Sequence, residues 1–363
     1  MDHRIVTALA VKLLRLVDLS KPRVETLSLL ILGIFSARTV NLSHLACERA
    51  GGAMIASTYR RFQRFFQHVH LPQDWACEAV AGMVGEPNSW TLCLDRTYWM
   101  VGRVHVNFLV LAVVTRRCRV PLMWSLLGWK GNSGAPERIA LLERFIAKFG
   151  KARIRLLLSD REFVGYDWIN HLVQNDIPFV TRMMEGHHVV NAAGHVHKLV
   201  HHFARRDTHI FGPGKFTGLL PSQRAGMPDL NLTFAAKVTA EGDRLIVATN
   251  RPSLNALEEY RKRWAIECLF ADAKTRGFNF EDTHLRDPRK LDLLMSIIAL
   301  AAAWASRTAR KVMGTRDLPR KPHGYYAKSW FRTGFDIIRN LLRNRNIKLV
   351  NTWPDHRKSW GVV

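Results

Sequence analysis

The apolar positions of the first 88 residues recur at helical spacing. They are dense over residues 27–37, and shorter helical patterns follow over 38–46 and 57–66. In the last of these, phenylalanines occupy one face and arginines the opposite face, and Ser57 is placed to cap the start. The pattern therefore predicts a helical region over residues 1–88.

From residue 89 the pattern changes to apolar runs that are rich in β-branched and aromatic residues. Three such runs, separated by short turns, predict an antiparallel meander. A helix is expected next, entered at residues 133–136 and ended by Gly150. The remaining elements alternate strand, helix and strand up to residue 182, an order that predicts a mixed sheet flanked by helices. The expected strands cover residues 90–99, 104–116, 120–127, 154–158 and 178–182, and the last helix covers 166–174.

Residues 183–243 interrupt this order with His, Gly and short β-prone pieces, such as 195–200 and 232–238. An insertion that folds as its own small β-unit is the simplest account. An apolar strand resumes at 244–250, and two helices are expected after it, over 253–277 and 291–312. The core is therefore expected in two parts, with bounds at 89–182 and 244–312, followed by a separate segment over 313–363.

Composition and charge narrow the function classes. Hydrophobic residues make up 47% of the chain, which excludes wholesale disorder, and no apolar run reaches the roughly 18–20 residues that cross a bilayer. The net charge is +24, and residues 285–363 hold 17 Lys and Arg against five acids, so the C-terminal segment is expected to be basic as well as helical. Five widely spaced cysteines fit a reducing interior. Such a protein most often handles a polyanion, and nucleic acid is the leading candidate.

Two acids interrupt positions where strands should be apolar. Asp95 breaks the first predicted strand, and Asp160 directly follows a fully apolar strand. A buried carboxylate is costly unless it is paired or binds a metal. Arg96 or Arg161 could neutralise these acids as purely structural partners, so each acid alone leaves both interpretations open.

The helix predicted over 253–277 carries a polar stripe. At 100° per residue, Tyr260, Arg263, Glu267 and Lys274 fall within an arc of about 60°. Large apolar residues lie beside this stripe, whereas a solvated lattice of salt bridges would keep them away. Three oxygen ligands from Asp95, Asp160 and Glu267 would favour Mg²⁺ or Mn²⁺, and two such ions can support an in-line attack on a phosphodiester.

The spacing of these four stripe residues resembles the YREK signature of bacterial DDE transposases of the IS-four type, relatives of the Tn-five and Tn-ten enzymes. Residues 93–97 resemble the strand that carries the first aspartate of that family, and residues 158–163 resemble the second block. The resemblance covers roughly residues 89–285 and is weak at both ends of the chain.

The resemblance implies a ribonuclease-H-like α/β catalytic core, interrupted by a β-rich insertion before the helix that bears the glutamate. It also implies cut-and-paste transposition of an insertion sequence by a homodimer that pairs the two transposon ends. The terminal inverted repeats and the target would be double-stranded DNA. Carried over by position, Asp95, Asp160 and Glu267 hold two Mg²⁺ or Mn²⁺ ions, and Tyr260, Arg263 and Lys274 hold DNA phosphates.

The sequence departs from the better-known relatives in the insertion. Those relatives use a Trp there to stack a flipped base, whereas no Trp occurs between Trp168 and Trp264. Phe203, Phe211 and Phe216 are the alternative stacking residues. The same insertion is rich in histidine, but its His spacing fits no familiar zinc site.

The N-terminal helices are expected to bind DNA, with Arg60, Arg61 and Arg64 as candidate contacts. Two other functions stay open: a DNA-binding regulator that has lost cleavage, and a ribonuclease-H-like nuclease with another substrate. A bacterial cytoplasmic protein associated with the nucleoid is expected in each case.

Overall fold

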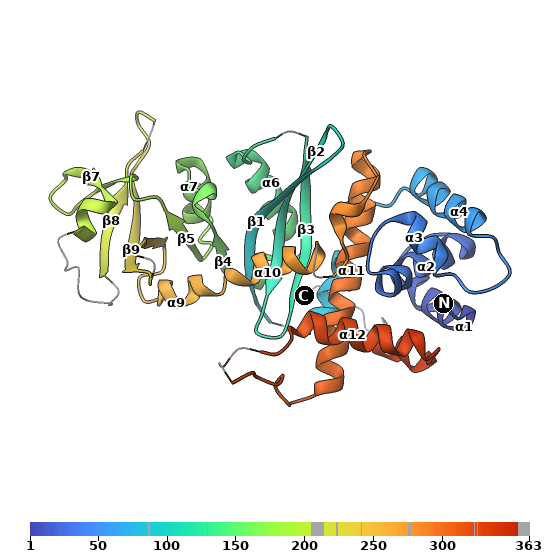
Figure 1. Cartoon of the computed structure of the whole chain (residues 1–363). Helices are drawn as coiled ribbons and strands as arrows, with labels where there is room; N and C mark the ends of the chain where they lie inside the picture. Colours follow the sequence, from blue (N-terminus) through green and yellow to red (C-terminus); the bar gives the residue numbers. More distant parts are fainter. Residues whose placement is uncertain are drawn as a thin grey trace.

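The structure is a computed structural model that describes residues 1–85, 88–128, 130–204, 214–222, 224–240, 242–274, 277–322, 324 and 326–354. Within these residues, one mixed sheet holds all ten named strands. The strands are β1 (Trp90–Val101), β2 (Val104–Val114), β3 (Arg119–Leu127), β4 (Ile154–Ser159), β5 (Phe179–Met183), β6 (His188–Val190), β7 (Val196–Lys198), β8 (Gly214–Leu220), β9 (Leu230–Val238) and β10 (Arg244–Thr249). Their order is β3-β2-β1-β4-β5-β10-β9-β8-β6-β7 (Figure 1).

The first five strands follow the predicted order. β1, β2 and β3 are antiparallel neighbours joined by short turns, and β4 and β5 then run parallel to β1. Parallel neighbours need a crossover connection, which α6 (Ala135–Phe149) and α7 (Tyr166–Gln174) provide. This large mixed α/β sheet is consistent with the ribonuclease-H-like core that the sequence resemblance implies.

The insertion does not fold as a separate β-unit, so that expectation is wrong. β10 pairs with β5 on one side and with β9 on the other, and β8, β6 and β7 continue outward from β9. Joining the sheet satisfies the backbone groups that β10 would otherwise leave unpaired at an edge. The β-prone piece at 195–200 is also shorter than expected, because α8 (Leu199–Ala204) follows β7 at once.

The N-terminal region is helical as far as the structure describes it, with α1 (His3–Leu13), α2 (Lys21–Ala37), α3 (Leu42–Cys47), α4 (Ile55–His68) and α5 (Cys77–Val84). Phe62, Phe65 and Phe66 of α4 are buried as predicted. The predicted cap is wrong, because α4 begins two residues before Ser57 and Met54 is its N-cap.

The central helix of the molecule is α11 (Pro288–Met313), which contacts β3, α2, α5 and α12 (Trp330–Arg343). Asp287 caps its start by accepting hydrogen bonds from the backbone N–H groups of Arg289 and Lys290. The helix is long and apolar enough to span a bilayer by length and composition, but most of its apolar stretch is buried inside the protein. It separates the sheet from α1–α4 (Figure 1).

α11 and α12 approach so closely that one position between them accepts only glycine. A Cβ atom on Gly334 would clash with the backbone carbonyl of Ala305. Overpacking of this kind costs roughly 2–3 kcal/mol, so Gly334→Ala is expected to lower the free energy of unfolding by that amount. Urea denaturation measures it, with Gly52→Ala as the control because no atom lies within 4 Å of its added Cβ. Equal stability of the two variants would contradict the close packing.

Candidate active site

Asp95 and Asp160 lie side by side where the parallel pairing of β1 with β4 ends. Leu94 of β1 pairs with Ser159 of β4 in parallel register, and each acid is the next residue along the chain. β4 ends at Ser159, whereas β1 continues to Val101 and pairs Asp95 with Val110 of β2. The backbone register alone therefore brings together two acids that are 65 positions apart in the sequence.

The helix predicted over residues 253–277 is interrupted at Lys262 and Arg263. α9 (Ala256–Arg261) ends two residues before α10 (Trp264–Ala273) begins. Between them, the backbone N–H groups of Arg263 and Ile266 donate to carbonyls three residues earlier, a tighter turn than the α-helix. Lys262 and Arg263 keep right-handed helical dihedrals, so the side chains on either side of this turn can still meet at one site.

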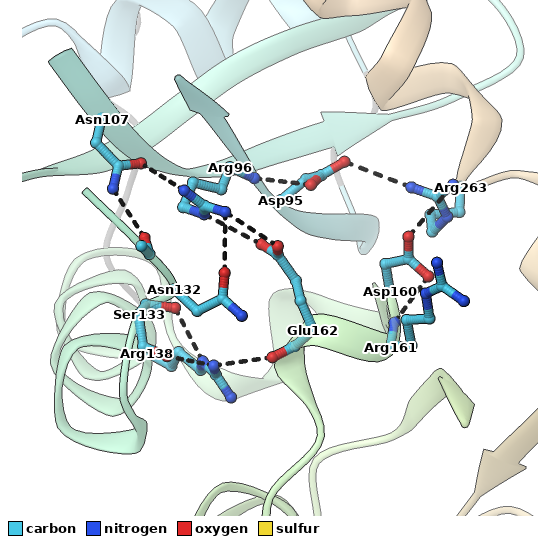
Figure 2. Close-up of polar contacts among 11 residues, drawn as sticks. Asp95, Arg96, Asn107, Asn132, Ser133, Arg138, Asp160, Arg161, Glu162 and Arg263 are labelled. Atoms are coloured by element: carbon cyan, nitrogen blue, oxygen red, sulfur yellow. Dashed lines mark hydrogen bonds and ion pairs between the residues drawn. The ribbon is translucent and has the colours of Figure 1, made fainter. Parts of the chain in front are cut away.

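The guanidinium of Arg263 contacts all three predicted acids. Its Nη1 lies 3.4 Å from Asp95 Oδ2, and its Nη2 lies 4.0 Å from Asp160 Oδ2 and also forms an ion pair with Glu267 Oε1. Figure 2 shows Asp95 and Asp160 pointing toward Arg263 from the two strands. Asp95, Asp160 and Glu267 thus lie around one cation, the Arg263 guanidinium.

Tyr260 joins this cluster, whereas Lys274 does not. The Tyr260 hydroxyl donates to Asp160 Oδ1 over 3.2 Å. Lys274 lies beyond the end of α10, where its ammonium forms a 2.7 Å ion pair with Glu281 and donates to Tyr98 O over 3.5 Å. The expectation that all four signature residues lie on one helical stripe is therefore wrong for Lys274, because the helix ends before it.

Burial dominates the electrostatics of Asp95. It raises the pKa of this carboxyl from 3.8 to about 6, although the Arg96 backbone N–H and the Arg263 guanidinium lower it. Burial alone would lower the pKa of Arg263, but Tyr260 and the three acids raise it, and Arg263 stays charged. The site therefore holds a carboxylate whose ionised form is incompletely compensated.

A second ion pair ties the two aspartate-bearing segments together. Arg96, next to Asp95, donates to both carboxylate oxygens of Glu162, two residues after Asp160. Asn107 and Asn132 each accept a further hydrogen bond from Arg96, as Figure 2 shows. The Arg96 guanidinium therefore pairs with Glu162, and only the Arg96 backbone N–H donates to the Asp95 side chain. The sequence offered a signal for this pair, since both residues belong to the two blocks that carry the aspartates.

The donor set fits a hard divalent cation by type but not by its present spacing. Carboxylate oxygens are the ligands that Mg²⁺ and Mn²⁺ prefer. Among the described residues, no three His, Cys, Asp or Glu side chains are grouped closely enough to hold an ion. Arg263 occupies the space among Asp95, Asp160 and Glu267, so joint coordination requires this guanidinium to move.

The stability of the chain should report the uncompensated charge of Asp95. Because its folded-state pKa lies near 6 and its usual value is 3.8, the folded state binds more protons between these pH values, and stability falls as pH rises through them. Asp95→Asn removes this penalty. Without divalent ions it should be more stable than the wild type by about 1–3 kcal/mol at pH 7.5.

Urea denaturation of both proteins at pH 7.5 and pH 4 tests this prediction. At pH 4 the folded wild type carries a protonated Asp95, so the two proteins should differ little. A stability difference of the same size at both pH values would contradict a raised pKa.

The predicted N-terminal arginines differ in their surroundings. Arg61 donates to Thr26 Oγ1 and Pro22 O, and its guanidinium lies 3.5 Å from Glu25, so it fastens α4 to α2. The interpretation of Arg61 as a free DNA contact is not supported by this placement. Arg60 and Arg64 are exposed.

The predicted stacking residues of the insertion pack inward. Phe203 is buried, and its ring lies 5.4 Å from that of Phe216, which stacks on Phe234. Phe211 lies outside the described residues. An exposed aromatic instead follows Arg263, since Trp264 is 65% exposed and lines an open hollow with Tyr260 and Arg263. The predicted helical wheel placed Trp264 beside the core, whereas the structure leaves it exposed.

Comparison with known protein families finds a similarity over part of the chain. Residues 131–304 match the family model of the transposase DDE domain, just under half of the chain. The matched region includes Asp160, Arg263 and Glu267 and begins after the strand that carries Asp95. None of the curated proteins matches the chain. The family match supports a transposase of the DDE type.

Proposed function

We propose that this chain is an insertion-sequence transposase that cleaves DNA at transposon ends and joins those ends to a target by cut-and-paste transposition. The observation that carries the proposal is the convergence of Asp95, Asp160 and Glu267, from three distant segments, on Arg263. The similarity of residues 131–304 to the transposase DDE domain supports it independently. The net charge of +24 suits a DNA substrate.

Asp95, Asp160 and Glu267 would hold two Mg²⁺ or Mn²⁺ ions. When bound, such ions activate a water or a 3′-hydroxyl and stabilise the leaving oxygen of an in-line displacement. When the ions are absent, Arg263 supplies the positive charge among these acids. Its guanidinium is suited to bind a DNA phosphate beside the carboxylates, since its planar fork matches phosphate oxygens.

The other signature residues would bind DNA around this centre. Tyr260 presents its hydroxyl beside Asp160, where it can donate to a phosphate oxygen. Lys274 lies near Tyr98, which is three residues beyond Asp95 on β1. When DNA binds, the Lys274 ammonium would leave Glu281 and contact a phosphate farther from the cleaved bond. Asp160 accepts hydrogen bonds from the Tyr260 hydroxyl and from the Arg161 backbone N–H.

A cleavage assay tests the function. Purified protein is incubated with duplex DNA that carries the terminal inverted repeats flanking its coding region, with Mg²⁺, Mn²⁺ or EDTA. Metal-dependent nicking at the repeat end, followed by strand joining, is expected. DNA binding without cleavage under every metal condition would favour the regulator. Cleavage that ignores the repeats, or that prefers an RNA–DNA hybrid, would favour the other nuclease.

The same material tests the assembly. We propose a homodimer that pairs two transposon ends, acting on DNA of the bacterial nucleoid in the cytoplasm. Light scattering of the protein with end DNA should give two chains and two duplexes in one complex. A complex of one chain and one duplex would reject the paired-end dimer.

Trp264 is proposed to stack on a base near the cleaved end, because its indole is exposed beside Arg263. Stacking contributes roughly 1–3 kcal/mol per base, so Trp264→Ala should slow cleavage by about 10-fold or more, and Trp264→Phe should retain most of the rate. A 2-aminopurine base placed at the end of the repeat reports the contact by fluorescence quenching. Unchanged quenching and rate in the Ala variant would exclude this role.

A further inference from the structure

A polar pocket of about 430 Å³ lies on the side of α11 that faces the N-terminal helices. Its walls come from the start of α3, from α4, and from the segment that leads into α11. The first and last of these walls are joined by a hydrogen bond between Asn41 Nδ2 and His284 Nε2, over 3.2 Å. The pocket is thus built jointly by the N-terminal helices and by the segment following α10, and it is separate from the carboxylate cluster.

The lining of this pocket is cationic and carries no carboxylate. Arg64 has no hydrogen bond or ion pair with the residues that the structure describes. The Lys290 ammonium donates to Gln67 Oε1 over 2.6 Å, a neutral partner. Asp287 caps α11 and also attracts Lys290, and Asp292, the acid closest to Lys290 in sequence, accepts from Trp124 Nε1. Two positive charges therefore face one hollow, and neither forms an ion pair with an acid among the described residues.

Most of the remaining polar side chains of the lining are types that contact the DNA backbone. Tyr59, Gln63 and Ser43 add hydroxyl and amide donors to the two cations. Arg, Lys, Ser, Asn, Gln and Tyr side chains supply most contacts to phosphate and sugar oxygens in protein–DNA complexes. An acidic peptide would also meet the cations, but a strongly basic chain that carries a transposase DDE match favours DNA.

We propose that this pocket binds the sugar-phosphate backbone of double-stranded DNA, with Arg64 and Lys290 each neutralising one phosphate. The inference rests on the proposed function only for the choice of DNA. It assigns DNA contacts that the carboxylate site does not make. Of the candidate contacts from the sequence it keeps Arg64, and it adds Lys290 in place of Arg61. DNA held here is gripped at once by α4 and by the first turn of α11.

The salt dependence of DNA binding tests the pocket. Affinity for a duplex carrying the terminal repeat is measured in EDTA, which prevents cleavage, by fluorescence anisotropy across a range of salt concentrations. Each neutralised phosphate contributes about 0.9 to the slope of log affinity against log salt. The double variant Arg64→Ala/Lys290→Ala should therefore lose about 1.8 of this slope and bind ~10-fold or more weakly at low salt. Arg64→Lys/Lys290→Arg should keep the wild-type slope.

Arg15→Ala is the matched control, because Arg15 is an exposed cation on another face of the N-terminal helices and does not line the pocket. It should leave the slope unchanged. A double variant that keeps the wild-type slope overturns the pocket and leaves the proposed function standing. Loss of slope in the charge-preserving variant as well would show a purely structural role and would also overturn it. Absence of DNA binding by the wild type would reject the proposed function itself.

Discussion

Replacing Asp95, Asp160 or Glu267 with the corresponding amide should lower the rate of DNA cleavage by at least ~10³-fold. Each side chain would supply an anionic oxygen ligand, and an amide of the same shape cannot neutralise a divalent ion. The three variants should lose cleavage by similar factors, because the three acids would act as one unit and the loss of any one of them would disable the whole site. Single-turnover cleavage of end DNA in Mg²⁺ measures the effect.

DNA binding is the readout that separates catalysis from folding. The three amide variants should bind end DNA about as tightly as the wild type in EDTA, because none of them removes a positive charge. Asp243→Asn, an exposed acid remote in sequence from the cluster, should retain full cleavage. Cleavage within about tenfold of wild type in any one of the three variants would remove that acid from the proposed metal site.

Arg263→Met should destabilise the chain by about 3–5 kcal/mol at pH 7.5. The Arg263 side chain is 11% exposed and contacts Asp95, Asp160 and Glu267, so its loss leaves buried negative charge without a partner. Glu267 is 38% exposed and should contribute least, because water screens it. Urea denaturation without divalent ions measures the loss.

The pH dependence identifies the cause of this destabilisation. Without Arg263 the pKa of Asp95 should rise further above 6, so protonation removes the penalty as pH falls, and the variant should approach wild-type stability near pH 4–5. Arg261→Met is the matched control, since Arg261 is an exposed neighbour whose ion-pair partner, among the residues that the structure describes, is Glu258. Equal stability of the Met variants at pH 7.5 would show that Arg263 does not balance the acids.

The sequence allowed several parts of the fold to be predicted because their signals are local. The β-rich apolar runs over 90–127, separated by short turns, indicated the three-stranded meander, and Pro136 and Gly150 marked the ends of α6. Asp95 and Asp160 stood out because a charge in an apolar strand violates the local pattern. Their convergence with Glu267 was a prediction from family resemblance, and the coordinates place all three around Arg263.

Other features depend on contacts between distant segments. A tight turn at Lys262 and Arg263 divides one predicted helix into α9 and α10, and α10 ends before Lys274. A helical wheel assumes a constant 100° and shows neither such a turn nor the end of the helix. The sequence offered Arg96 as a possible partner of Asp95, its neighbour in the chain, whereas the Arg96 guanidinium pairs with Glu162, its neighbour in space.

The sequence by itself thus determined the main strands and helices of the core and which acids are out of place, since periodicity and local charge act over a few residues. Only the tertiary structure decided that the insertion strands continue the main sheet, that one arginine contacts the three acids, and that Lys290 shares a pocket with Arg64. These outcomes depend on strand register, on a local break in helix geometry and on burial. Each of them is set by the whole fold, because pairing and desolvation act on groups that are adjacent only after the chain has folded.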